Sequence, residues 1–175
     1  MNRFHVLSIK RRHAHLETGD SDVADLFIDR KLLQEWVWDV KISKRGEVPF
    51  RIEPYESIDF SRISPPSRLL FGEVTPSDDE DEFGRVALLQ CSCGCSGCFP
   101  VYFRITVSEK EVRWSEPSNP HRDGREYLGS PDQHYRKLAP FVFDRTQYEE
   151  AWLNSAKEGG LVSADTFGFR GDGRA

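Results

Sequence analysis

Three stretches rich in β-branched and aromatic residues follow one another in the middle of the chain, and they restrict the possible fold more than any other feature. They are Arg85–Gln90, Val101–Val107 and Val112–Ser115. Strands joined by short connections pair antiparallel, because parallel neighbours need a crossover of about a dozen residues or more. The sequence therefore predicts an antiparallel meander, and we expect an α+β fold with a mainly antiparallel sheet.

A helix is predicted near the C-terminal end of the chain. Phe141–Phe143 has the composition of a strand and stops at Asp144, a residue type that favours the N-cap of a helix. Gln147 stands at the third position after Asp144, so the two residues fit a capping-box-like pattern. We expect this helix to continue to about Lys157 and to pack on the sheet.

The N-terminal part of the chain is predicted to add two strands, at Phe4–Lys10 and Asp25–Asp29, which are rich in β-forming residues. In Leu32–Val40 the apolar residues fall at helical spacing, although part of the stretch also alternates like a strand. We expect a short helix there that runs into a strand. Prolines and serines within residues 53–68 predict a connecting loop.

The length and charge of the chain narrow the class of protein. Its 175 residues fit one domain, which we expect over residues 1–160, followed by a flexible Gly-rich tail at 161–175. The net charge of −5, with both signs mixed along the chain, gives no basic footprint for nucleic acid. No stretch approaches the roughly 18 apolar residues of a membrane span, and the first residues do not resemble a signal peptide. We expect a cytoplasmic protein without nucleic-acid or membrane partners, in which thiols stay reduced.

All four cysteines of the chain are clustered, at positions 91, 93, 95 and 98. Reduced thiolates are good ligands for Zn²⁺, which prefers four ligands in a tetrahedron. The spacing differs from that of a zinc finger, and four ligands from one short turn would be crowded. Three thiolates with one distant residue fit better, and His121 is the candidate because it follows the third strand of the meander. Two alternatives stay open: a redox pair or copper(I) site, and reduced cysteines that only pack.

A zinc site of this kind is expected to be structural. Catalytic zinc keeps an open position beside a general base and seldom uses several thiolates. Neither H-E-x-x-H nor H-x-E with P-C-x-x-C occurs in the sequence, and no signature supports a nucleophilic Cys–His pair. His13 and His15 alternate as in a strand, and such a pair can bind a metal, but their Arg and Glu neighbours favour a solvent-exposed position.

The segment from Leu89 to Pro100 resembles the C-x-C-G-x-x-G-C-[aromatic]-P turn of a group of uncharacterised bacterial proteins, largely actinobacterial. On this pattern the motif cysteines are Cys91, Cys93 and Cys98, whereas Cys95 occupies a variable position. The resemblance is therefore compatible with a three-thiolate site and with Cys95 being incidental.

The likeness to this group continues beyond the turn. It extends through Val112–Ser115, Pro120–Arg122 and the segment PFVFDRTQYE at Pro140–Glu149. It implies a shared fold, and the group has no established activity to carry over.

We therefore expect a non-catalytic intracellular binding or interaction protein of the immunity or accessory type, with another protein as its partner. Its zinc–thiolate turn would use Cys91, Cys93, Cys98 and His121. One alternative is a thiol-redox or zinc-dependent enzyme that uses the same cysteines with His121. Another is a protein that senses or sequesters metal.

Overall fold

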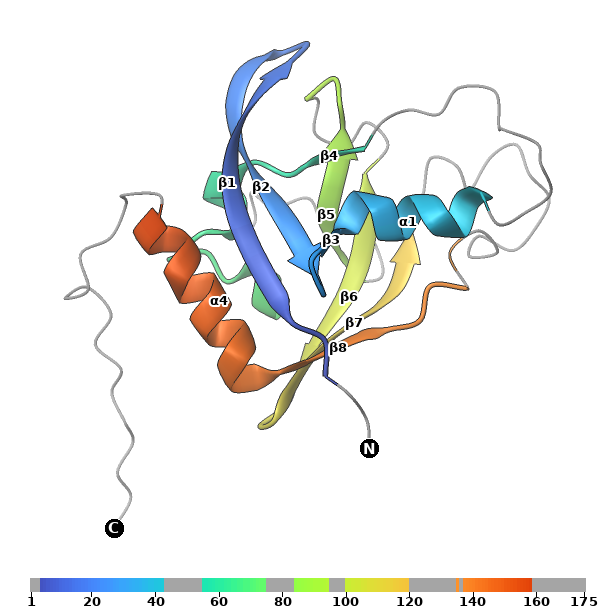
Figure 1. Cartoon of the computed structure of the whole chain (residues 1–175), viewed down its shortest axis with the longest axis vertical. Helices are drawn as coiled ribbons and strands as arrows, with labels where there is room; N and C mark the ends of the chain where they lie inside the picture. Colours follow the sequence, from blue (N-terminus) through green and yellow to red (C-terminus); the bar gives the residue numbers. More distant parts are fainter. Residues whose placement is uncertain are drawn as a thin grey trace.

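The computed structural model describes residues 4–42, 55–74, 84–94, 100–119, 135 and 137–158. Its strands form two antiparallel sheets (Figure 1). The first sheet has the order β1–β2–β3, with bounds Leu7–Leu16, Gly19–Ile28 and Lys31–Leu32. The second has the order β4–β5–β6–β7–β8, with bounds Tyr55–Ser57, Val86–Cys91, Val101–Val107, Glu111–Ser118 and Phe141–Asp144. The helices are α1 (Leu33–Ile42), α2 (Phe60–Ile63), the 3-10 helix η1 (Leu69–Phe71) and α4 (Arg145–Glu158).

The structure confirms the predicted α+β class. β5, β6 and β7 are consecutive antiparallel neighbours, as a meander requires, and β8 pairs antiparallel with β7. The C-terminal helix α4 packs against β1, β7 and β8. Within the described ranges, no helix has the length and apolar character that crossing a membrane requires. The domain boundary predicted at residue 160 lies outside those ranges.

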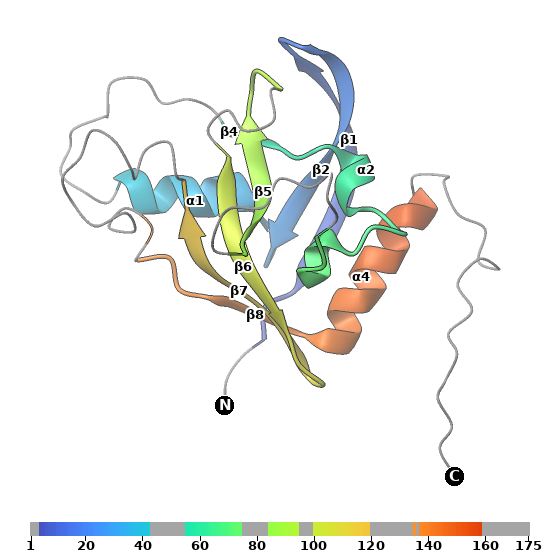
Figure 2. The same cartoon turned by 180° about the vertical axis from the view of Figure 1, so that it is seen from behind.

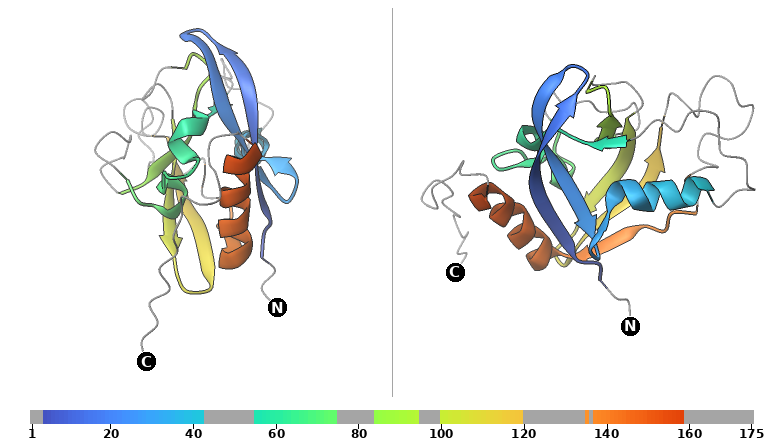
Figure 3. Two further views of the ribbon diagram at one scale, coloured as in Figure 1. Left: turned by 90° about the vertical axis from the view of Figure 1, so that its left-hand side faces the viewer. Right: turned by 45° about the horizontal axis from the view of Figure 1, so that its top comes forward.

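The two sheets are joined at two seams by single β-bridges. At one seam His5 forms a parallel bridge with Phe143, and its backbone N–H donates to the carbonyl of Val142 at 2.7 Å. At the other seam Val23 forms an antiparallel bridge with Asp59. The left view of Figure 3 shows the β1–β2 hairpin and the second sheet as two layers. The bridges close these layers around one core.

Aromatic side chains of α4 connect the helix to both the meander and the segment before it. Tyr148 is fully buried; its hydroxyl accepts from Trp114 Nε1 at 2.9 Å and donates to the carbonyl of Leu70 at 2.6 Å. Trp152 Nε1 donates to the carbonyl of Ile63 at 2.9 Å, and Figure 2 shows α2 beside the C-terminal end of α4. The buried indoles of Trp114 and Trp152 are therefore core residues, with their N–H groups satisfied inside the fold.

The predicted helix–strand order over Leu32–Val40 is wrong. Lys31–Leu32 is a short strand, β3, and the helix α1 follows it from Leu33. Leu33 and Val37 are fully buried and lie one helical turn apart, on the same side of α1. Helical spacing therefore decides the structure of this stretch, and the alternating pattern is incidental.

The predicted loop at residues 53–68 is also wrong, because its described part contains regular structure. β4 pairs with β5 in the register Glu56↔Gln90, and α2 begins after Asp59, whose Oδ1 accepts the N–H of Ser61 at 2.8 Å. Both elements are short, with three residues in β4 and four in α2. Elements of this length show too little periodicity to be detected in a sequence.

β1 continues to Leu16, beyond its predicted end at Lys10, so Arg11 and Arg12 lie inside a strand. Arg11 Nε donates to Asp22 at 2.9 Å, and Arg12 Nε donates to Asp25 at 2.8 Å. Acidic residues of β2 therefore compensate the basic residues of β1 across the hairpin.

The predicted start of α4 is confirmed by its cap. Asp144 Oδ1 accepts the backbone N–H of Gln147 at 3.0 Å. The reciprocal half of the capping box is not formed, because the side chain of Gln147 bonds to Leu7 of β1 instead.

Candidate functional site

The cysteine turn begins where β5 ends. Cys91 is the last residue of β5 and is 8 % exposed, and Cys93 follows in the turn and is half-buried. The backbone N–H of Cys93 lies 3.5 Å from Cys91 Sγ, and the N–H of Gly94 donates to the carbonyl of Cys91 at 3.0 Å. An N–H group directed at sulfur stabilises negative charge there, as is common around metal-bound thiolates.

The tip of the β1–β2 hairpin holds this turn in place. The backbone N–H of Thr18 donates to the carbonyl of Cys93 at 3.1 Å. Gly94 has a φ of +80°, and a Cβ added there would lie 2.2 Å from Thr18 Oγ1 and 3.0 Å from the side chain of Leu16. Only glycine fits this contact, because any side chain would collide with the hairpin and would also strain the backbone.

The structure brings together only part of the predicted metal site. Cys91 and Cys93 lie in one turn. Cys95, Cys98 and His121 lie outside the described residues. The zinc site therefore remains a prediction.

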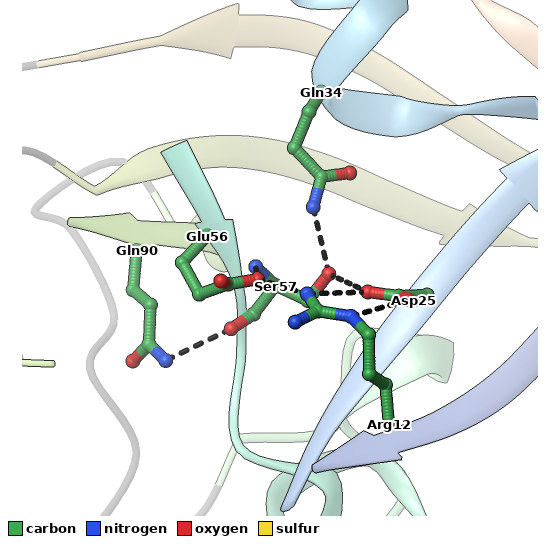
Figure 4. A network of polar contacts seen from close by, with 6 residues as sticks. All are labelled: Arg12, Asp25, Gln34, Glu56, Ser57 and Gln90. Atoms are coloured by element: carbon green, nitrogen blue, oxygen red, sulfur yellow. Dashed lines mark hydrogen bonds and ion pairs between the residues drawn. The ribbon is translucent and has the colours of Figure 1, made fainter. Parts of the chain in front are cut away.

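A polar network that no sequence pattern indicates lies between the two sheets (Figure 4). At its centre Ser57, which is 1 % exposed, donates its hydroxyl proton to Asp25 Oδ1 at 2.7 Å and accepts from Gln34 Nε2 at 2.7 Å. The carbonyl of Ser57 accepts from Gln90 Nε2 at 2.8 Å. The network thus links β2, α1, β4 and β5 at one buried serine.

Arg12 of β1 completes this network from its more exposed side. It forms an ion pair with Asp25, at 2.8 Å, and a second with Glu56. The pKa of Arg12 is raised, mainly by the hydrogen bond to Asp25 and further by Glu56, although burial acts in the opposite direction. The buried carboxylate of Asp25 thus has a permanent counter-charge.

The network is arranged for structure rather than for catalysis. A serine nucleophile needs an accessible oxygen and a base that takes its proton. The hydroxyl of Ser57 is buried, and it donates to a carboxylate that Arg12 already neutralises. No sequence signal could have revealed the network, because its members are common polar residues that only the strand register brings together.

A second polar group occupies the exposed end of the β1–β2 hairpin. It consists of His13 and His15 on β1 and of Asp20 and Asp22 on β2. The pKa of Asp20 is lowered, mainly by its hydrogen bond with His15. The pKa of Asp22 is lowered mainly by Arg11 and then by His13. Both histidines are exposed, as the sequence predicts.

The fold and these groups define an α+β protein of two antiparallel sheets with a hairpin-clamped cysteine turn. Comparisons with protein-family models, with curated proteins and with solved structures found no significant match. The predicted likeness to the bacterial group therefore remains a prediction.

Proposed function

We propose that the chain is a non-catalytic intracellular binding protein, of the immunity or accessory type, whose cysteine turn holds a structural zinc ion. The ligands of the zinc ion are Cys91, Cys93, Cys98 and His121. The binding partner of the chain is another protein. The observation that carries the proposal is the position of the Cys93 N–H, 3.5 Å from Cys91 Sγ. This contact favours a thiolate at Cys91 in a turn that the hairpin already holds.

A structural role for the metal is supported by the surroundings of Cys91. The residue is 8 % exposed and ends a strand of the central meander. A zinc ion there would connect β5 to the residues that follow the turn. Metal binding in such a site contributes directly to folding stability, because the unfolded chain has no preformed site.

A binding role is supported by the way in which the described polar groups are used. The network around Ser57 and Asp25 consists of internal hydrogen bonds and ion pairs, so it holds the sheets together. The hairpin tip beside the cysteine turn is exposed and carries charged and polar side chains. A zinc-stiffened turn next to an exposed hairpin offers a rigid surface to a protein partner.

The proposal is tested on the full chain purified without a histidine tag. Zinc content, reactive thiols and thermal unfolding are measured for the native chain, for Cys91→Ser and for Cys95→Ser. We expect about one zinc per chain in the native protein and in Cys95→Ser. Cys91→Ser should lose the zinc and unfold at a lower temperature. Native protein that contains no zinc and titrates with four reactive thiols would refute the proposal.

The same contact at Cys91 also suits the second candidate, a thiol-redox enzyme, because stabilised thiolates are reactive. The two candidates differ in the rate of alkylation. A zinc-bound thiolate reacts slowly until a chelator removes the metal, whereas a redox thiolate reacts fast and forms a disulfide that thiols reduce again. Metal sensing would require reversible metal exchange without loss of the fold.

A further inference from the structure

The exposed end of the β1–β2 hairpin carries two histidines and two aspartates in a regular array. His13 lies directly opposite Asp22, and His15 lies directly opposite Asp20, in the antiparallel register. Alternate residues of a strand point to the same face, so all four side chains lie on one face of the hairpin. Figure 1 shows this end of the hairpin extending beyond the rest of the fold.

Three of these side chains bring potential metal ligands close together. His15 Nδ1 lies 2.7 Å from Asp20 Oδ1, and His13 Nε2 lies 3.6 Å from Asp20 Oδ2. One ligand atom from each of the three residues falls within 4.8 Å of the others. A metal ion would displace the proton shared by His15 and Asp20, and small side-chain rotations would let each ligand atom lie roughly 2.0–2.2 Å from the ion.

Asp22 contacts His13 at Nδ1, the ring nitrogen other than the one that faces Asp20. Its Oδ1 lies 3.2 Å from His13 Nδ1, and its Oδ2 accepts from Arg11 Nε at 2.9 Å. An ionised carboxylate only accepts hydrogen bonds, so a neutral His13 ring that bonds to Asp22 does so with its proton on Nδ1. In that tautomer the lone pair of His13 is on Nε2, the atom that faces Asp20. Metal-binding histidines are held by carboxylates in this way.

We infer that His13, His15 and Asp20 form a binding site for a divalent transition-metal ion, with Asp22 as a positioning residue. Two imidazoles and one carboxylate suit Zn²⁺, Ni²⁺ or Cu²⁺, whereas Ca²⁺ and Mg²⁺ prefer oxygen ligands throughout. The side chain of His15 is 81 % exposed, so water or a partner's side chain completes the coordination. The site shares no residue with the cysteine turn and does not depend on the function proposed above.

A metal at this position would cross-link β1 and β2 close to the hairpin turn. That turn contains Thr18, whose backbone holds Cys93 in place. The ion would therefore stiffen the segment that clamps the cysteine turn.

The site is tested with Ni²⁺ as the probe, on the full ¹⁵N-labelled chain without a tag. Calorimetry gives the dissociation constant, and paramagnetic broadening of amide signals locates the ion. We expect broadening centred on residues 11–22. His15→Asn should weaken Ni²⁺ binding at least tenfold, and Asp22→Asn should weaken it by about tenfold, because it removes only the orientation of His13.

His5→Gln is the matched control, since His5 also contacts a carboxylate, Asp29, at 2.9 Å. The dissociation constant of this variant should stay within about twofold of the native value if the paired histidines form the site. The amide spectrum of each variant shows whether the fold is retained. Equal Ni²⁺ affinity in His15→Asn and the native chain would overturn the inference. Loss of Ni²⁺ affinity in Cys91→Ser, together with native affinity in His15→Asn, would also overturn the inference, because that result places the ion at the cysteines.

Discussion

The side-chain amide of Gln147 bonds to both backbone groups of Leu7. Its Oε1 accepts the N–H of Leu7 at 3.3 Å, and its Nε2 donates to the carbonyl of Leu7 at 2.8 Å. The amide therefore pairs with the backbone N–H and C=O groups at the start of β1, as a neighbouring strand would. Because Leu7 is 1 % exposed, water could not replace these bonds without opening the contact between α4 and β1.

Gln147→Ala should consequently lower the free energy of unfolding by about 1–3 kcal/mol, since it leaves two buried backbone groups without partners. Urea denaturation followed by tryptophan fluorescence measures the change. Glu150→Ala, at an exposed position of the same helix, is the control and should change stability by less than about 0.5 kcal/mol. Equal effects of the two substitutions would contradict the role given to Gln147.

Gly94→Ala should destabilise the fold through the contact of the cysteine turn with the hairpin. The substitution combines a left-handed backbone, at φ +80°, with a Cβ only 2.2 Å from Thr18 Oγ1. We expect a loss above about 2 kcal/mol, because the backbone strain alone costs about 1–2 kcal/mol. Thermal and urea unfolding provide the measurement.

Gly19→Ala separates the two contributions to this loss. Gly19 also has a positive φ, +124°, but an added Cβ would meet nothing within 4 Å. It should therefore show the backbone cost without the collision. If Gly94→Ala cost no more than the roughly 1–2 kcal/mol of backbone strain, the packing of Gly94 on Thr18 would be without energetic consequence.

Asp59 should make stability depend on pH in the acidic range. Burial acts to raise the pKa of Asp59, but hydrogen bonds from Ser61 and Ser21 outweigh it and lower the pKa below its ordinary value of 3.8. Folding therefore favours the ionised form, so the stabilisation is present above about pH 4 and is lost as the pH falls through the lowered folded pKa.

Asp59→Ala tests the direction of this pH dependence of stability. It should cost about 1–2 kcal/mol at pH 7, where it removes the N-cap of α2, and progressively less below about pH 4. Unfolding by urea at a series of pH values gives the difference. The exposed turn residue Glu109 provides the control, and Glu109→Ala should stay within about 0.5 kcal/mol of the native chain at pH 7. A cost of Asp59→Ala that grows toward low pH would refute the assignment.

The parts of the fold that the sequence predicts are those coded by local signals. The meander follows from apolar runs with short connections, and α4 follows from the N-cap at Asp144. The seams could not be predicted, because each depends on a single bridge between residues far apart in the chain, such as His5 and Phe143. β4 and α2 are too short to produce a periodic pattern.

The candidate sites show the same division. Clustering alone identified the cysteine turn, whereas its clamp by Thr18 depends on the path of a distant hairpin. The pair His13 and His15 was visible in the sequence, but its carboxylate partners become apparent only through the register that places Asp20 and Asp22 opposite. Ser57 gave no signal, since its role arises from the four elements that meet around it.

Zinc X-ray absorption spectroscopy of the tag-free chain shows whether a zinc ion is bound at the cysteine turn and which atoms bind it. We predict about one zinc per chain with three sulfur ligands near 2.3 Å and one nitrogen ligand. Those ligands correspond to Cys91, Cys93, Cys98 and His121. A spectrum with only nitrogen and oxygen ligands, or a chain without zinc, would refute the zinc site at the cysteine turn.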